Sequence, residues 1–175
     1  MHILCVITFI TTSVSAAQYK STQEVKNDII NTYDTLFQKE SVYNASYAPL
    51  RTLVSNLDQY IMGKQGVVIG KKSSGPGKLA SQKIHGLGNI FNVWHDNIVV
   101  IVNAQIDTIQ KLRVSPNDTQ ARDALESWKD TSWPLMKSSV EKIRAETILD
   151  SKKKLADIVL LFIDKNITLL GKALS

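Results

Sequence analysis

Cysteine is almost missing from this sequence of 175 residues, because its single cysteine, Cys5, lies in an apolar segment at the N-terminus. Residues 1–16 combine an apolar run with the small residues Val14 and Ala16, a pattern that predicts a secretory signal peptide cleaved after Ala16. Residues 17–175 would then form one secreted domain with neither a thiol nor a disulfide. That composition excludes cysteine nucleophiles, thiolate metal sites and redox chemistry, and it requires a real hydrophobic core.

Long apolar segments and histidines are scarce after residue 16. The longest apolar candidate, residues 155–170, is interrupted by charged residues, so we expect no transmembrane segment. The two histidines in this part of the chain, His85 and His95, are ten residues apart, which is not a metal-ligand spacing on one helical turn. We therefore expect neither a metal site nor a cofactor.

Catalytic and nucleotide-binding motifs are also lacking. Residues 70–78 resemble a phosphate-binding loop superficially, but Lys72 occupies the position of its first glycine and Leu79 replaces the required Ser or Thr. No Gly-x-Ser-x-Gly motif is present, and no pair of carboxylates is placed for acid–base work. We expect a protein without catalytic residues. Its net charge of +5 is too small to predict nucleic-acid binding.

Glycine is concentrated in one region, since seven of the eight glycines lie between Gly63 and Gly88. This region also carries Pro76 and five lysines, so we expect an irregular, Gly/Lys-rich loop. Within it, Val67–Ile69 is a short apolar segment that predicts a strand or an insertion into the core. Four lysines close together in the sequence are candidates for binding an anionic glycan or a lipid headgroup: Lys71, Lys72, Lys78 and Lys83.

Outside this loop, apolar residues recur every three or four positions, which predicts an all-α, single-domain bundle of five or six amphipathic helices. Ser21 and Glu24 match a capping box at the start of the first helix. Trp133 and Pro134 indicate a new helix start, and the last helix is either separate from the preceding one or continuous with it. The expected helices cover residues 21–40, 47–62, 89–114, 119–128, 133–149 and 151–173.

The stretch from Asn89 to Val114 is the most apolar part of the chain after residue 16. Its middle, Ile98–Val102, consists of five β-branched residues, which favours a strand. The flanking apolar residues step by three or four and no Gly or Pro interrupts them, which favours a helix. We interpret the stretch as a central helix that is buried on most sides.

Large apolar side chains lie on several of the predicted helix faces, and simple core packing accounts for them. The functional alternative is an apolar cavity among the helices that holds a fatty acid or another amphiphile. The residues expected to line this ligand site are Tyr60, Phe91, Trp94, Ile98 and Phe162.

Three Asn-x-Ser/Thr sequons predict N-glycosylation in a secreted protein. Asn44 and Asn117 fall in predicted loops, where the glycosylating enzyme can reach them. Asn166 falls four residues after Phe162 on the apolar face of the last helix, where a glycan would block packing.

Three functions agree with this pattern. The first is a secreted, non-enzymatic binding protein that carries or sequesters a small apolar ligand. The second is a secreted effector, of the kind found in saliva, venom or body fluid, that acts on a protein or an anionic surface through a helix face or the Lys-rich loop. The third is a bundle that opens and inserts apolar helices into a membrane.

Overall fold

The computed structural model describes residues 20–70 and 90–175, and it shows a bundle of α-helices. Counting the joined α5 and α6 as one helix, the described part of the chain contains five helices and no strand, which confirms the predicted all-α, single-domain bundle. A π-helical turn precedes α4, and a second one joins α5 to α6 into one long helix. The elements are α1 (Thr22–Phe37), a 3₁₀ turn (Val42–Asn44), α2 (Ala48–Gly70), a π turn (Val93–Ile98), α4 (Val99–Val114), α5 (Thr119–Ser127), a π turn (Trp128–Ser132), α6 (Trp133–Glu146) and α7 (Asp150–Leu174).

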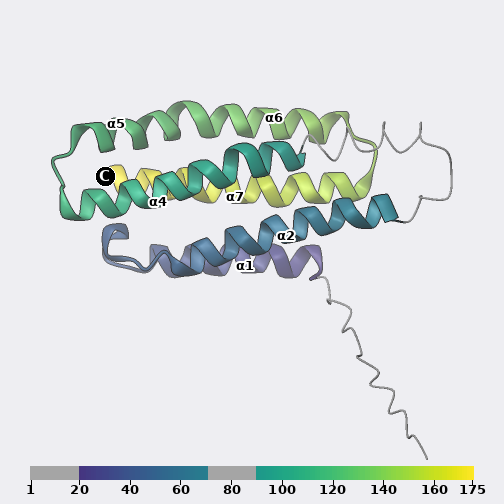
Figure 1. Ribbon diagram of the computed structural model, residues 1–175, viewed down its shortest axis with the longest axis horizontal. Helices are drawn as coiled ribbons and strands as arrows, with labels where there is room; N and C mark the ends of the chain where they lie inside the picture. The colour runs from purple at the N-terminus through teal and green to yellow at the C-terminus, as the bar shows by residue number, and fades with distance from the viewer. Residues whose placement is uncertain (1–19, 71–89) are drawn as a thin grey trace, which may run out of the picture.

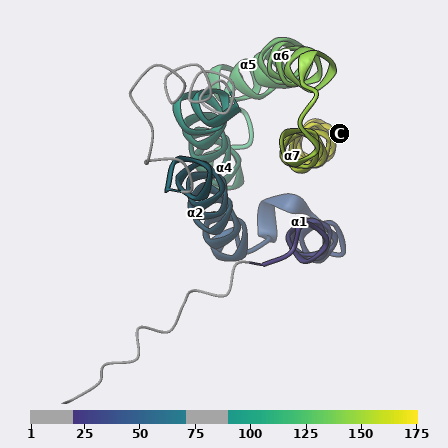
Figure 2. The same ribbon diagram turned by 90° about the vertical axis from the view of Figure 1, so that its right-hand side faces the viewer.

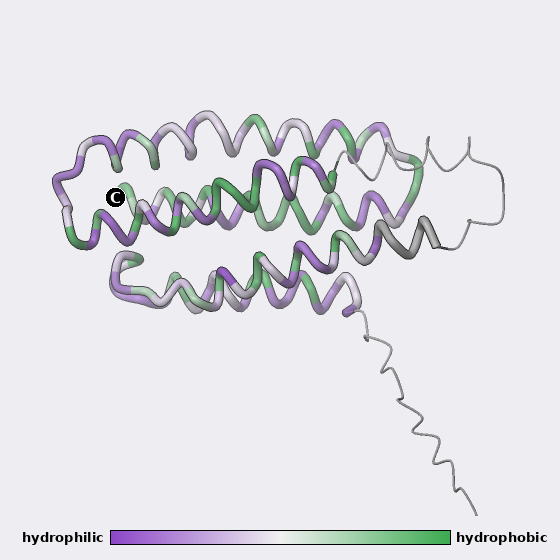
Figure 3. Tube along the Cα trace, viewed as in Figure 1, coloured by the Kyte–Doolittle hydropathy of each residue, from purple (hydrophilic) through white to green (hydrophobic). Residues whose placement is uncertain are grey.

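Apart from α5 and α6, which continue in one direction, successive helices run in opposite directions along the long axis of the bundle (Figure 1). In this view α5 and α6 lie along the top, α4 and α7 in the middle, and α1 and α2 along the bottom. Viewed from the end, α2 and α4 form one side and α1 and α7 the other (Figure 2). The closest packing joins α7 to α6 and to α1. Along each helix, hydrophilic and hydrophobic residues alternate at helical spacing, as a bundle requires (Figure 3).

The start of α1 forms the predicted capping box. The Ser21 hydroxyl accepts a hydrogen bond from the Glu24 backbone N–H at 3.2 Å, and the Glu24 carboxylate accepts one from the Ser21 N–H at 2.6 Å. These two bonds satisfy N–H groups that have no partner within the helix. The helix ends at Phe37, slightly before the expected Glu40.

The region from Gly63 to Gly70 is helical, which corrects the sequence prediction of a loop. α2 continues through it to Gly70, so the helix does not end at Met62 and Val67–Ile69 is not a strand. Each glycine disfavours a helix by about 1 kcal/mol relative to alanine. Extending an existing helix costs much less than starting one, so the helix continues through these glycines.

The central stretch is helical, as predicted, but it differs from the prediction in burial. Ile98 and Val102 are 0% exposed, whereas Val100 between them is 60% exposed. The expectation that this helix is buried on most sides is therefore wrong, because in this bundle α4 is a wall with one face in solvent. The widest buried face belongs to α7, which buries ten of its residues.

The helix pair α6 and α7 is separated by a short connection, so the last helix is not continuous with the preceding one. α6 ends at Glu146, before the expected Leu149, and α7 begins at Asp150. In contrast, Trp133 does not begin a new helix after a loop. Its backbone N–H bonds to the Trp128 carbonyl across the π turn, which keeps α5 and α6 continuous and places Pro134 in a helical first turn.

Candidate ligand site in the bundle interior

Three aromatic rings from different elements meet in the middle of the bundle. Phe162 of α7 packs edge-on against Trp94 of the first π turn, with ring centroids 5.0 Å apart. Tyr33 of α1 also packs edge-on against Phe162, at 5.8 Å. All three side chains are 0% exposed. This aromatic cluster therefore spans the interior from one wall of the bundle to the other.

A chain of buried hydrogen bonds lies beside the aromatic cluster. The indole Nε1 of Trp133 donates to Gln105 Oε1 at 3.1 Å, and Gln105 Nε2 donates to Asn166 Oδ1 at 3.4 Å. Asn166 Nδ2 in turn donates to the Phe162 carbonyl at 2.9 Å. Gln105 and Asn166 are both 0% exposed. The chain links α6, α4 and α7, and its members satisfy one another as buried polar groups must.

Two polar atoms of the aromatic cluster lack such partners. The Tyr33 hydroxyl and Trp94 Nε1 are buried without a hydrogen-bond partner among the described residues. Burial raises the pKa of Tyr33 well above its usual range, and the neighbouring Asn166 side chain opposes this rise only in part. The Tyr33 hydroxyl therefore remains a neutral donor at physiological pH, and the indole N–H of Trp94 is a donor that does not titrate. Leaving a buried donor unpaired costs about 1–3 kcal/mol, so an acceptor placed beside either donor would be stabilised.

The structure brings together some of the residues expected to line a ligand site. Trp94 and Phe162 touch each other, and Ile98 lies one helical turn after Trp94 in the same core. Tyr60 is 9% exposed, and its hydroxyl lies 3.4 Å from that of Thr22. Phe91 is only partly buried and stacks on the ring of His95 at 5.2 Å. The interior candidates are therefore Trp94, Ile98 and Phe162, with Phe91 and Tyr60 nearer the surface.

Sequence reasoning missed the polar members of this interior. Gln105 lies one turn after Val102 and one turn before Ile109, on the apolar side of α4, which was a signal of a buried amide. Asn166 gave the same signal one turn after Phe162. Tyr33 was recognised as part of an apolar face, but nothing in the sequence indicated that its hydroxyl would be unpaired.

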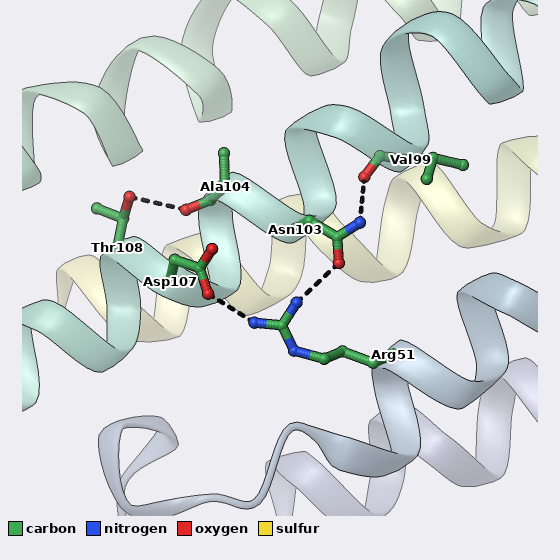
Figure 4. A network of polar contacts seen from close by, with 6 residues as sticks. All are labelled: Arg51, Val99, Asn103, Ala104, Asp107 and Thr108. Carbon is green, nitrogen blue, oxygen red and sulfur yellow. Dashed lines mark hydrogen bonds and ion pairs between the residues drawn. The ribbon is translucent and has the colours of Figure 1, made fainter.

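The α2–α4 side of the bundle is held by polar contacts at the surface (Figure 4). Arg51 of α2 donates to Asn103 Oδ1 at 2.9 Å and to Asp107 Oδ1 at 2.6 Å on α4. His95 Nδ1 lies 3.1 Å from Asp58 Oδ1 of α2. In the described ranges the backbones of α2 and α4 approach each other less closely than those of α1 and α7. In the part of the chain that the structure describes, the α2–α4 side is therefore less closely packed than the α1–α7 side.

The remaining predicted sites lie at the surface or outside the described residues. Asn44 and Asn117 are exposed, as glycosylation requires. Asn166 is fully buried with its Nδ2 engaged, so a glycan there would have to displace the core. The four anion-binding candidates Lys71, Lys72, Lys78 and Lys83 lie outside the described residues.

Within residues 20–70 and 90–175, no group of three or more His, Cys, Asp or Glu side chains is arranged to hold a metal ion. Across the same residues, no helix is both long enough and apolar enough to cross a membrane. No family model matches the chain, and neither a curated protein nor a solved structure is significantly similar to it.

Proposed function

We propose that the protein is a secreted, non-enzymatic glycoprotein that binds a small amphiphile in the interior of its helical bundle. The ligand has an apolar body and a hydrogen-bond acceptor, such as the carboxylate of a fatty acid. One observation carries the proposal: the unpaired donors Tyr33 Oη and Trp94 Nε1 belong to rings that both pack on Phe162. The apolar body would lie among the surrounding aliphatic side chains, where burial stabilises it by about 0.8 kcal/mol per methylene.

The ligand enters by separation of α2 from α4. The Arg51–Asp107 pair is exposed on both partners, and such pairs contribute about 0–1 kcal/mol. Breaking it costs little compared with opening the tightly packed α1–α7 side. The acceptor of the ligand then pairs with donors that are already buried, so its polar group is not left unsatisfied in the core.

The Tyr33→Phe variant tests the site because it removes the unpaired hydroxyl and keeps the ring. We expect its affinity for oleate to fall by roughly 10- to 150-fold, since a hydrogen bond to a charged acceptor contributes about 1.5–3 kcal/mol. The free energy of unfolding of the ligand-free variant should rise by about 1 kcal/mol, because a buried unpaired polar group is gone. Isothermal titration calorimetry and urea unfolding measure the two effects.

Tyr47→Phe is the matched control. Tyr47 is 2% exposed and its hydroxyl donates to the Val42 carbonyl at 2.9 Å, so this tyrosine differs from Tyr33 in having a partner. We expect Tyr47→Phe to lower the free energy of unfolding by about 1 kcal/mol and to leave oleate affinity unchanged. Equal oleate affinity in the wild type and in Tyr33→Phe would remove the proposed site. A wild-type protein that binds no oleate would favour the rival class, a secreted factor that acts on a protein partner.

A further inference from the structure

The connection between α6 and α7 presents two neighbouring aliphatic side chains to solvent. Ile148 is 93% exposed and Leu149 is 45% exposed. The connection lies at one end of the bundle, opposite the end that carries the connection between α4 and α5 (Figure 1). Single exposed apolar residues are common on protein surfaces, but two in sequence at a protruding turn are candidates for contact with another apolar phase.

Three consecutive lysines follow these aliphatic residues in the first turn of α7. Lys154 lies 3.4 Å from Asp150, and both groups are exposed. Lys152 and Lys153 form no ion pair with the described residues. Lysines in the first turn of a helix are unfavourable for the helix dipole, so the helix itself does not explain their presence.

α2 also exposes an apolar and a basic side chain, but it lies across the bundle from α7 (Figure 2). Met62 is 51% exposed, and the exposed Lys64 lies over the ring of Tyr60 at 5.2 Å. We call the surface formed by Ile148, Leu149, Lys152, Lys153 and Lys154 the lysine end.

We propose that the lysine end docks on an anionic membrane surface. Ile148 and Leu149 enter the boundary between headgroups and acyl chains, and the lysines lie at the level of the lipid phosphates. Apolar side chains flanked by lysines match this interface in both polarity and charge. Two aliphatic side chains at a turn form too small a patch for the core of a stable protein interface, which buries about 800 Å² on each partner.

The opposite end of the bundle agrees with this orientation. It carries the 3₁₀ turn with Asn44 and the connection between α4 and α5 with Asn117, both exposed. Glycans on these two asparagines would point away from a membrane that contacts the lysine end. We call this opposite end the sequon end. Docking and interior ligand binding use different residues, so either one can fail without the other.

Co-sedimentation of the full secreted protein with vesicles tests the proposal. We expect binding to vesicles of phosphatidylserine and phosphatidylcholine, and at least tenfold weaker binding to pure phosphatidylcholine. Ile148→Asp combined with Leu149→Asp should reduce binding to the anionic vesicles at least tenfold. Lys152→Gln combined with Lys153→Gln should reduce it about tenfold or more, because each lysine near an anionic surface contributes about fivefold.

Val114→Asp is the matched control, because Val114 is 83% exposed and lies at the sequon end. Its vesicle binding should equal that of the wild type, and circular dichroism should show the same helix content in all variants. Wild-type protein that stays in the supernatant with anionic vesicles would overturn the proposal. So would unchanged binding in the Ile148 and Leu149 double variant, or retention on a heparin column without vesicle binding.

Discussion

At the sequon end of the bundle, two exposed asparagines lie in short connections that side-chain hydrogen bonds hold in place. Tyr47 donates to the Val42 carbonyl there, and Tyr43 donates to the Ala173 carbonyl of α7. At the lysine end, two exposed aliphatic residues occupy the α6–α7 connection, and three lysines follow at the start of α7. The core needs neither set of exposed residues, because the apolar periodicity of the helices stops before both turns. Side chains that packing does not require are the better indicators of function.

The largest expected effect comes from moving a glycan to the lysine end. Leu149→Asn creates a sequon with Asp150 and Ser151 at the proposed membrane contact. We expect the glycosylated variant to lose vesicle binding, because a bulky polar glycan holds the turn away from the lipid. Co-sedimentation before and after enzymatic deglycosylation measures the effect.

The control for this change removes glycans from the opposite end. Asn44→Gln combined with Asn117→Gln should leave vesicle binding within about twofold of the wild type, since neither position faces the membrane. A loss of binding in this control, or full binding in glycosylated Leu149→Asn, would contradict the assigned orientation.

The next prediction concerns the bundle interior and a smaller effect, a change in the free energy of unfolding. Trp133→Phe removes the indole that donates to Gln105 and leaves a buried carbonyl oxygen without its partner. We expect the free energy of unfolding to fall by about 2–3 kcal/mol. Trp128→Phe is the control. Because Trp128 is only partly buried, this substitution should lower the free energy of unfolding by less than about 1 kcal/mol. Equal losses in urea unfolding would show that the buried hydrogen bond contributes nothing specific.

The smallest expected effect is the acid sensitivity of the sequon end. Lys111, at 2.6 Å, and then the Ala121 N–H hold the pKa of Asp118 below its usual value of about 4. A lowered folded-state pKa stabilises the protein above the unfolded pKa, and this contribution is lost as the pH falls through the folded pKa. Asp118→Asn keeps a side chain that can cap α5, but it removes the carboxylate whose protonation reduces stability in acid. The difference in unfolding midpoint between wild type and variant should therefore shrink in acid, and a difference independent of pH would contradict the assignment.

The sequence predicts the fold well where local rules act alone. Ser21 and Glu24 indicate the capping box, and helical spacing around Ile98 and Val102 outweighs five β-branched residues. The prediction fails where the tertiary arrangement decides. Val100 is exposed because α4 is a wall of the bundle, and Gly63 to Gly70 is helical because α2 extends an existing helix.

The candidate site could be predicted only in part. The apolar spacing identifies Trp94 and Phe162 as interior residues, but it cannot indicate that the Trp94 N–H lacks a partner. Gln105 and Asn166 pair across helices that are far apart in the chain, so their hydrogen bond depends on a register that local periodicity does not specify. The lysines after Leu149 were visible in the sequence, but their meaning required knowing that the turn protrudes.

The central claim is that the bundle interior holds an amphiphile, and native mass spectrometry of the protein purified from a eukaryotic secretion host tests it most directly. After deglycosylation, the account predicts an additional bound mass of roughly a few hundred daltons, the size of a small amphiphile. The same preparation of a Tyr33→Phe and Trp94→Phe double variant should retain much less of this mass. A wild-type protein that carries no bound mass, and that takes none up from added oleate, would contradict the claim.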